Sequence, residues 1–140
     1  MILVDTTVLV DIERGRNNIK KILENFSNQD EIFAISAITL RELFVGIGFT
    51  RYKLGTEASI KKVENIQKIC NDFNIIDVSQ EIFIRSGEKE GELIAKGISI
   101  GSEDIIIGIT AELMKASLII TRNPGHFSWS KVKILSYARD

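Results

Sequence analysis

Residues 1–7, MILVDTT, place a run of apolar side chains directly before an aspartate. An apolar run without alternation is typical of a strand that is buried on both faces, as in a parallel sheet. Because ligands bind beyond the carboxyl ends of the strands in such sheets, Asp5 is predicted to lie where the fold carries its chemistry. On this stretch alone a structural role is favoured, since Asp5 can also cap a helix that begins near Thr7.

The rest of the chain alternates strand-like runs with helix-patterned segments. This alternation predicts an α/β fold, a three-layer α/β/α sandwich with a central, mainly parallel sheet. A length of 140 residues fits one domain, spanning residues 1–140. The expected strands are Ile2–Val4, Ile32–Ile35, Ile75–Val78, Leu118–Thr121 and Val132–Leu135.

Apolar residues at helical spacing predict the helices. Another helix is expected from about Gln80 to Lys96. The segment Ile105–Ala111 is apolar or small almost all round, which indicates a helix in the interior of the protein. The buried stripes of three further helices are expected to be Ile19, Ile22, Leu23 and Phe26; Leu40, Leu43, Phe44 and Ile47; and Ile66, Ile69, Cys70 and Phe73.

The composition is that of an ordinary soluble protein, with 44% hydrophobic and 26% charged residues. No apolar stretch is long enough to span a bilayer and no basic region precedes an apolar one at the N-terminus, so neither a membrane segment nor a signal peptide is expected. A single cysteine, Cys70, rules out an internal disulfide and is compatible with a cytoplasmic location.

A net charge of −1 supplies no global attraction for nucleic acid, so a nucleic-acid substrate would need local basic patches. Solvated helix faces explain most of the basic pairs at least as well. These pairs are Arg14 with Arg16, Lys20 with Lys21, Arg51 with Lys53, and Lys61 with Lys62.

Other acids have ordinary explanations when each is taken alone. Glu42 lies beside the buried stripe of its predicted helix, from where it could reach a cleft, but a solvated side chain or an ion pair with a neighbouring arginine is favoured. Glu103 and Asp104 open the interior helix, and acids in a first turn interact well with the helix dipole. For Glu103 this explanation is preferred.

Taken in order, the acids occur in stretches that resemble the PIN domain family, most closely its VapC-type ribonuclease toxins. The four stretches are ILVDTTVLVDIERG (2–15), ISAITLRELFVGI (35–47), GEKEGELIAKGI (87–98) and SEDIIIGITAELMKASLIITRNPGHF (102–127). The matching positions are Asp5, Thr6 and Thr7; Glu42, Leu43 and Gly46; and Asp104, Gly108 and Ala111. The chain departs from the commoner pattern at Asn123, where many members have a fourth acid and some have asparagine.

The resemblance implies a metal-dependent endoribonuclease that leaves a 5′-phosphate on the RNA. It further implies the toxin of a toxin–antitoxin pair, inhibited by an antitoxin that covers the acidic cleft, and a homodimer. Asp5, Glu42 and Asp104 are then the catalytic residues, and Asn123 joins them as a candidate metal ligand.

Physical chemistry gives these acids a reason to lie together. Crowded carboxylates repel one another unless a cation neutralises them, and oxygen ligands without a Cys/His cluster favour Mg²⁺ or Mn²⁺ over zinc. Asp5 and Asp104 are expected to bind the ion directly, with Glu42 holding a water or ligating in turn. Thr6 and Thr121 are expected to hydrogen-bond around the acids.

The loop after the fourth strand offers weaker candidates. His126 and Phe127 are interpreted as loop packing, with substrate contact as the minority option. Arg122 could meet a phosphate, although a solvated side chain is the default.

Two other functions stay open. A non-catalytic PIN scaffold that binds RNA or protein is compatible with Asn123. A haloacid-dehalogenase-like phosphohydrolase is a weaker alternative, because such enzymes need a second acid where Thr7 stands.

Overall fold

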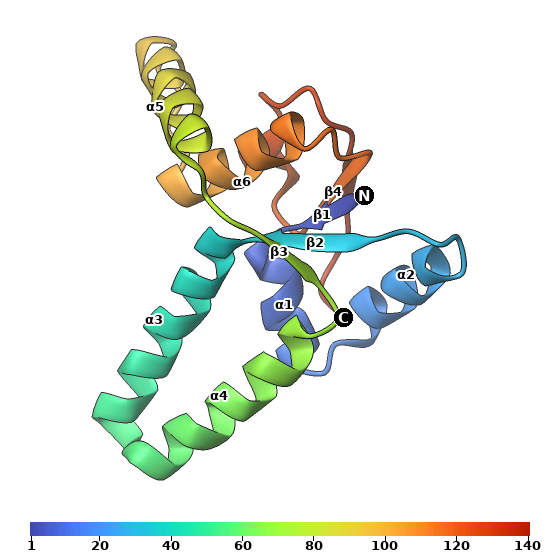
Figure 1. The fold of residues 1–140 in the computed structure, drawn as a ribbon, viewed down its shortest axis with the longest axis vertical. Coiled ribbons are helices and arrows are strands. Elements are labelled where there is room, and N and C mark those ends of the chain that lie inside the picture. Colours follow the sequence, from blue (N-terminus) through green and yellow to red (C-terminus); the bar gives the residue numbers. More distant parts are fainter.

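The computed structural model describes all 140 residues and contains one five-stranded sheet in the order β3-β2-β1-β4-β5 (Figure 1). Every neighbouring pair of strands is parallel, so the predicted sheet is confirmed and is wholly rather than mainly parallel. Two predicted strands agree to the residue and the other three shift by one or two positions at their ends. The strands are β1 Ile2–Val4, β2 Phe33–Ser36, β3 Asn74–Ile76, β4 Leu118–Thr121 and β5 Ile134–Ser136.

Helices cover both faces of the sheet, which confirms the three-layer sandwich. Side chains alternate along β1, so Ile2 and Val4 pack under α1 to α4 while Leu3 packs under α6. Burial of each such apolar side chain contributes about 1.5–3 kcal/mol. The helices are α1 Thr6–Glu13, α2 Asn17–Ser27, α3 Ala37–Leu54, α4 Thr56–Cys70, α5 Gln80–Ala95 and α6 Ser102–Leu113, with a 3₁₀ turn η1 at Pro124–Phe127.

The interior helix predicted from its composition is α6. Every residue from Ile105 to Ala111 is buried, because α6 lies between the sheet and α5. The α5 helix packs on the outer side of α6 and projects away from the sheet (Figure 1). Asp104 stands in the first turn of α6, at the carboxyl edge of the sheet.

The α3 and α4 helices form a long hairpin that extends beyond the sheet in the opposite direction from α5 (Figure 1). Leu43 and Ile47 are buried as predicted, but the prediction for Phe44 is wrong, because its side chain is 43% exposed. Only one side of α3 meets the core, and Phe44 lies outside that contact. No helix in the structure combines the length and hydrophobicity that crossing a membrane requires.

Candidate active site

Asp5 follows β1, the central strand, and its side chain is almost completely buried. It is the N-cap of α1: Oδ1 accepts a hydrogen bond from the Thr6 N–H at 2.7 Å. Oδ2 accepts hydrogen bonds from the hydroxyls of Thr7 at 2.8 Å and Thr121 at 2.7 Å. The predicted cap is therefore confirmed, and the same contacts hold the carboxylate at the carboxyl edge of the sheet. The structure also bears out the expected contact between Thr121 and an acid.

Glu42 comes to this edge from the second turn of α3. Its Oε1 accepts a hydrogen bond from the Thr6 hydroxyl at 2.8 Å, and the same hydroxyl lies 2.9 Å from the Thr39 hydroxyl. Thr6 thus contacts two acids, Asp5 through its backbone N–H and Glu42 through its side chain. This contact agrees with the expected role of Thr6. Glu42 is half-buried and forms no ion pair, so its interpretation as a solvated or arginine-paired side chain is wrong.

Asp104 is the third acid, and its partner corrects a prediction. Its Oδ2 lies 2.7 Å from Nδ1 of His126, whose side chain is 52% exposed. His126 is therefore not loop packing, although Phe127 beside it is fully buried as predicted. The short η1 turn after β4 brings the histidine back over α6. Pro124 at the start of η1 is a signal for this turn in the sequence, but it does not show which element His126 then contacts.

The three acids share one electrostatic environment. Burial raises the pKa of Glu42 above its ordinary value, and the charges of Asp5 and Asp104 raise it further against the lowering effect of the Thr6 hydrogen bond. Burial also raises the pKa of Asp104, with a further contribution from Asp5 and an opposing one from His126. The charge of Asp5 therefore disfavours the ionised forms of both Glu42 and Asp104, which come from two other elements at this edge of the sheet.

The donor set at this edge suits a hard cation that takes few protein ligands. Nowhere in the structure do three His, Cys, Asp or Glu side chains converge closely enough to hold one ion together. Mg²⁺ typically needs only one or two carboxylates and keeps several waters. Asp5 and Asp104 supply carboxylate oxygens, the type of ligand that Mg²⁺ prefers.

Asn123 and Glu103 lie at the margin of this arrangement. The Asn123 side chain is exposed and does not cap η1, while its backbone N–H donates to the Thr121 hydroxyl at 3.0 Å. Glu103 lies in the first turn of α6, as the dipole explanation predicts, and forms a long, exposed ion pair with Arg41 at 3.9 Å.

A buried ion pair behind the site was not visible in the sequence. Asp11, on α1, is completely inaccessible to solvent, and its Oδ2 lies 3.1 Å from Nε of Arg122 and accepts a hydrogen bond from the Tyr137 hydroxyl at 2.8 Å. The default of a solvated Arg122 is wrong, because only 21% of its side chain is exposed. The Arg122 N–H donates to the Thr7 hydroxyl at 3.2 Å, and Thr7 in turn donates to Asp5.

The family model described as PIN domain matches residues 2–132. The chain is also similar in structure to VapBC2 from Rickettsia felis, which was solved bound to a DNA fragment from its promoter. That similarity has 23% identity and a TM-score of 0.83, and covers 99% of this chain and 100% of the other.

Two further solved structures have the same fold. A DNA-bound VapBC from Salmonella typhimurium is 22% identical with a TM-score of 0.79, covering 98% of each chain. A toxin–antitoxin complex from Klebsiella pneumoniae is 29% identical with a TM-score of 0.73, covering 97% of each chain. A comparison with curated proteins finds no match.

Proposed function

The chain belongs to the PIN domain family, and on this premise we propose that it is a Mg²⁺- or Mn²⁺-dependent endoribonuclease, the toxin of a type II toxin–antitoxin pair. One observation supports the chemistry above all others: Asp5, Glu42 and Asp104 come from three elements at the carboxyl edge of a parallel sheet, and the charge of Asp5 raises the pKa of the other two acids. Ligands of open parallel sheets bind at this edge.

Asp5 and Asp104 are the proposed metal ligands, and Asn123 a weaker one through its amide oxygen. A bound divalent ion polarises the phosphodiester and lowers the pKa of the attacking water. The Thr6 N–H and the hydroxyls of Thr7 and Thr121 hold Asp5 in one orientation. Glu42 uses only Oε1 for its bond to Thr6, so its other oxygen is free to orient the water.

The proposed partners follow from the relatives and from the surface. The Klebsiella relative is a toxin–antitoxin complex, and the Rickettsia and Salmonella relatives are VapBC structures. Contiguous patches of exposed apolar side chains are typical of surfaces that bind protein partners. We assign such surfaces to a cognate antitoxin and a second copy of the chain, with RNA as the substrate in the cytoplasm. The side chains are Phe44, Val45 and Phe49 on α3, and Phe83 and Ile84 on α5.

The test is cleavage of an end-labelled single-stranded RNA by the purified protein. Cleavage is expected with Mg²⁺ or Mn²⁺, is lost on chelation and returns when the metal is restored. Asp5→Asn and Asp104→Asn are expected to abolish cleavage, because each removes a charged ligand at nearly constant volume. Asp72→Asn, a matched change at an exposed aspartate, should cleave as the wild type does.

Thermal denaturation accompanies each assay, so that loss of activity through unfolding is recognised. Full cleavage in excess chelator would contradict the metal mechanism, and a folded, fully active Asp5→Asn variant would contradict the assignment of the site. A wild-type protein that binds RNA and leaves it intact under every metal would be a scaffold rather than a nuclease.

A further inference from the structure

We propose that the surface between α1 and α4 is the path of the RNA strand on one side of the cleavage point. Its backbone phosphates contact Arg14 and Lys62 next to the site, then Lys61 and Lys68 farther along α4. This inference rests on the proposed nuclease function and adds to it the route by which the substrate reaches the acids.

Two adjoining hollows define this path. The first has a volume of about 370 Å³ and is lined by Thr6 and Glu42 of the site together with Arg14, Gly46 and Lys62. The second, about 630 Å³, shares Glu13 and Lys62 with the first and continues along α4 past Lys61 and Lys68. A chain that enters the first hollow therefore meets a catalytic acid at one end and the α4 lysines at the other.

Lys62 stands where the two hollows join. Its Nζ lies 3.6 Å from the position that a Cβ on Gly46 would occupy. Gly46 follows Glu42 by one helical turn of α3, so the Lys62 ammonium lies over the same face of α3 that presents the acid. A side chain longer than a methyl group at Gly46 would displace this ammonium.

The four cations on the path are free of intramolecular partners. Arg14, Lys61, Lys62 and Lys68 have no carboxylate within the 4.0 Å that defines an ion pair. By contrast, the cations in and directly after α5, and Arg41 of α3, are each paired with a carboxylate of the chain. These are Arg41 with Glu103, Arg85 with Glu81, and both Lys89 and Lys96 with Glu92.

The chemistry of the path selects a phosphodiester chain over an acidic protein segment. Apart from Glu42, its four cations face only two carboxylates, those of Glu13 and Glu64, so the surface favours an anion. Glu42 at the near end would repel the carboxylates of an acidic peptide, whereas a phosphate can reach the acids together with a divalent cation. No aromatic residue lines either hollow, so the contacts are to the backbone and independent of base sequence.

The test measures binding separately from cleavage. The Asp5→Asn variant serves as the background, and a fluorescein-labelled single-stranded RNA is titrated in Mg²⁺ over a range of salt concentrations. Adding Arg14→Gln and Lys62→Gln together removes two phosphate contacts. The slope of log affinity against log salt should then become shallower by about 1.4, with affinity reduced about tenfold at low salt. Replacing Lys62 by arginine instead of glutamine keeps the charge, so Lys62→Arg should retain most of the contribution of this residue to RNA affinity and to the salt slope.

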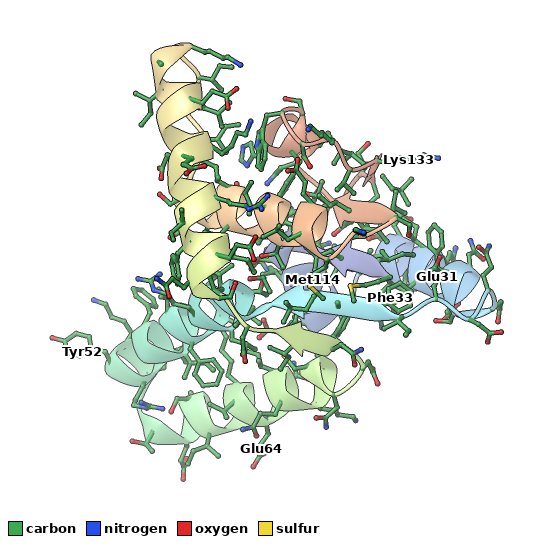
Figure 2. All side chains as sticks on the ribbon, turned by 45° about the horizontal axis from the view of Figure 1, so that its top comes forward. Glu31, Phe33, Tyr52, Glu64, Met114 and Lys133 are labelled. Carbon is green, nitrogen blue, oxygen red and sulfur yellow. The ribbon has the colours of Figure 1, made fainter.

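Lys131→Gln with Lys133→Gln is the matched control, because these lysines also lack carboxylate partners but follow η1 and precede β5. Figure 2 shows Lys133 on the opposite side of the molecule from Glu64 of α4. The control pair should leave the salt slope unchanged. Equal slopes for the two double variants would overturn the path. Stronger competition by a poly-glutamate peptide than by unlabelled RNA would overturn RNA as the occupant.

Cleavage kinetics of variants that retain Asp5 distinguish a failure of the proposed RNA path from a failure of the proposed nuclease function. If the path is right, Arg14→Gln with Lys62→Gln raises KM about tenfold and leaves kcat nearly unchanged. A wild-type enzyme that cleaves RNA, with KM unaffected in that variant, would refute the path and leave the nuclease function standing. A protein that binds RNA through these cations without ever cutting it would refute the function and leave the path standing.

Discussion

At the scale of single residues, the buried ion pair behind the site links stability to the position of Asp5. Arg122 contacts Asp11 through its side chain and Thr7 through its backbone N–H, and Thr7 donates to Asp5. Burial and the hydrogen bond to Asp11 raise the pKa of Tyr137, so its hydroxyl remains a donor to Asp11 at any physiological pH. The end of β4 and the segment after β5 are thereby fixed to α1.

Removing one partner of this pair should be costly. Arg122→Leu leaves the Asp11 charge buried without its nearest cation, and we expect the free energy of unfolding to fall by about 3 kcal/mol. Tyr137→Phe removes one hydrogen bond to the same carboxylate and should cost about 1–2 kcal/mol. Urea denaturation of both variants measures these losses. A loss below 1 kcal/mol in Arg122→Leu would show that Arg139, whose Nε lies 3.8 Å from Oδ1 of Asp11, compensates the charge without Arg122.

Asn123 offers a second test at this scale. Asn123→Asp adds a charge near the proposed ligands, so we expect tighter Mn²⁺ binding by calorimetry and lower stability of the metal-free protein at neutral pH. Asn123→Ala removes a neutral ligand at most and should reduce cleavage less than Asp5→Asn does. Unchanged Mn²⁺ affinity and unchanged metal-free stability in Asn123→Asp would place this side chain outside the site.

At the scale of elements, the sequence predicts the strands and helices whose burial depends on a local pattern of apolar residues. The apolar run before Asp5 and the apolar helix after Asp104 are continuous in sequence, and both are buried as predicted. The contacts of His126 with Asp104 and of Arg122 with Asp11 join distant segments, so no spacing in the sequence reveals them. Phe44 fits its helical stripe, but burial also depends on whether α3 faces a neighbour along its whole length, which the stripe does not specify.

The junction of α3 and α4 is the most constrained point of the hairpin. Gly55 is the only residue between the two helices and has φ +92° and ψ 174°, a conformation that residues with a Cβ rarely adopt. Gly55→Ala should therefore lower the free energy of unfolding by about 1–3 kcal/mol. Gly48→Ala is the control, because Gly48 lies inside α3 with open space around it and alanine should stabilise the helix there by about 0.5–1 kcal/mol. Equal effects of the two changes in urea denaturation would contradict this explanation.

At the scale of the whole molecule, the charges that the acidic site needs for its proposed function lower the stability of the fold. The raised pKa values of Glu42 and Asp104 mean that folding opposes their ionisation. The contribution of the two protonated acids to the free energy of unfolding is fully present below the ordinary pKa values of 4.5 and 3.8. It is lost as the pH rises through the raised pKa values of the folded protein. Exposed Glu92 affects the pH dependence of stability in the opposite direction, because its neighbours Lys89 and Lys96 lower its pKa to about 2.

The last prediction compares variants so that the contributions of other carboxylates cancel. Without metal, Glu42→Gln and Asp104→Asn should each become more stable relative to the wild type as the pH rises above 4.5, since each removes an ionisation that folding opposes. Saturating Mg²⁺ should reverse the order at neutral pH: the wild type gains about 2.7 kcal/mol at a concentration one hundred times Kd, while Asp104→Asn gains little. Urea denaturation in chelator and in Mg²⁺ across this pH range measures both effects. Parallel pH profiles for wild type and variants, with no stabilisation by Mg²⁺, would mean that the acids neither repel one another nor bind a cation.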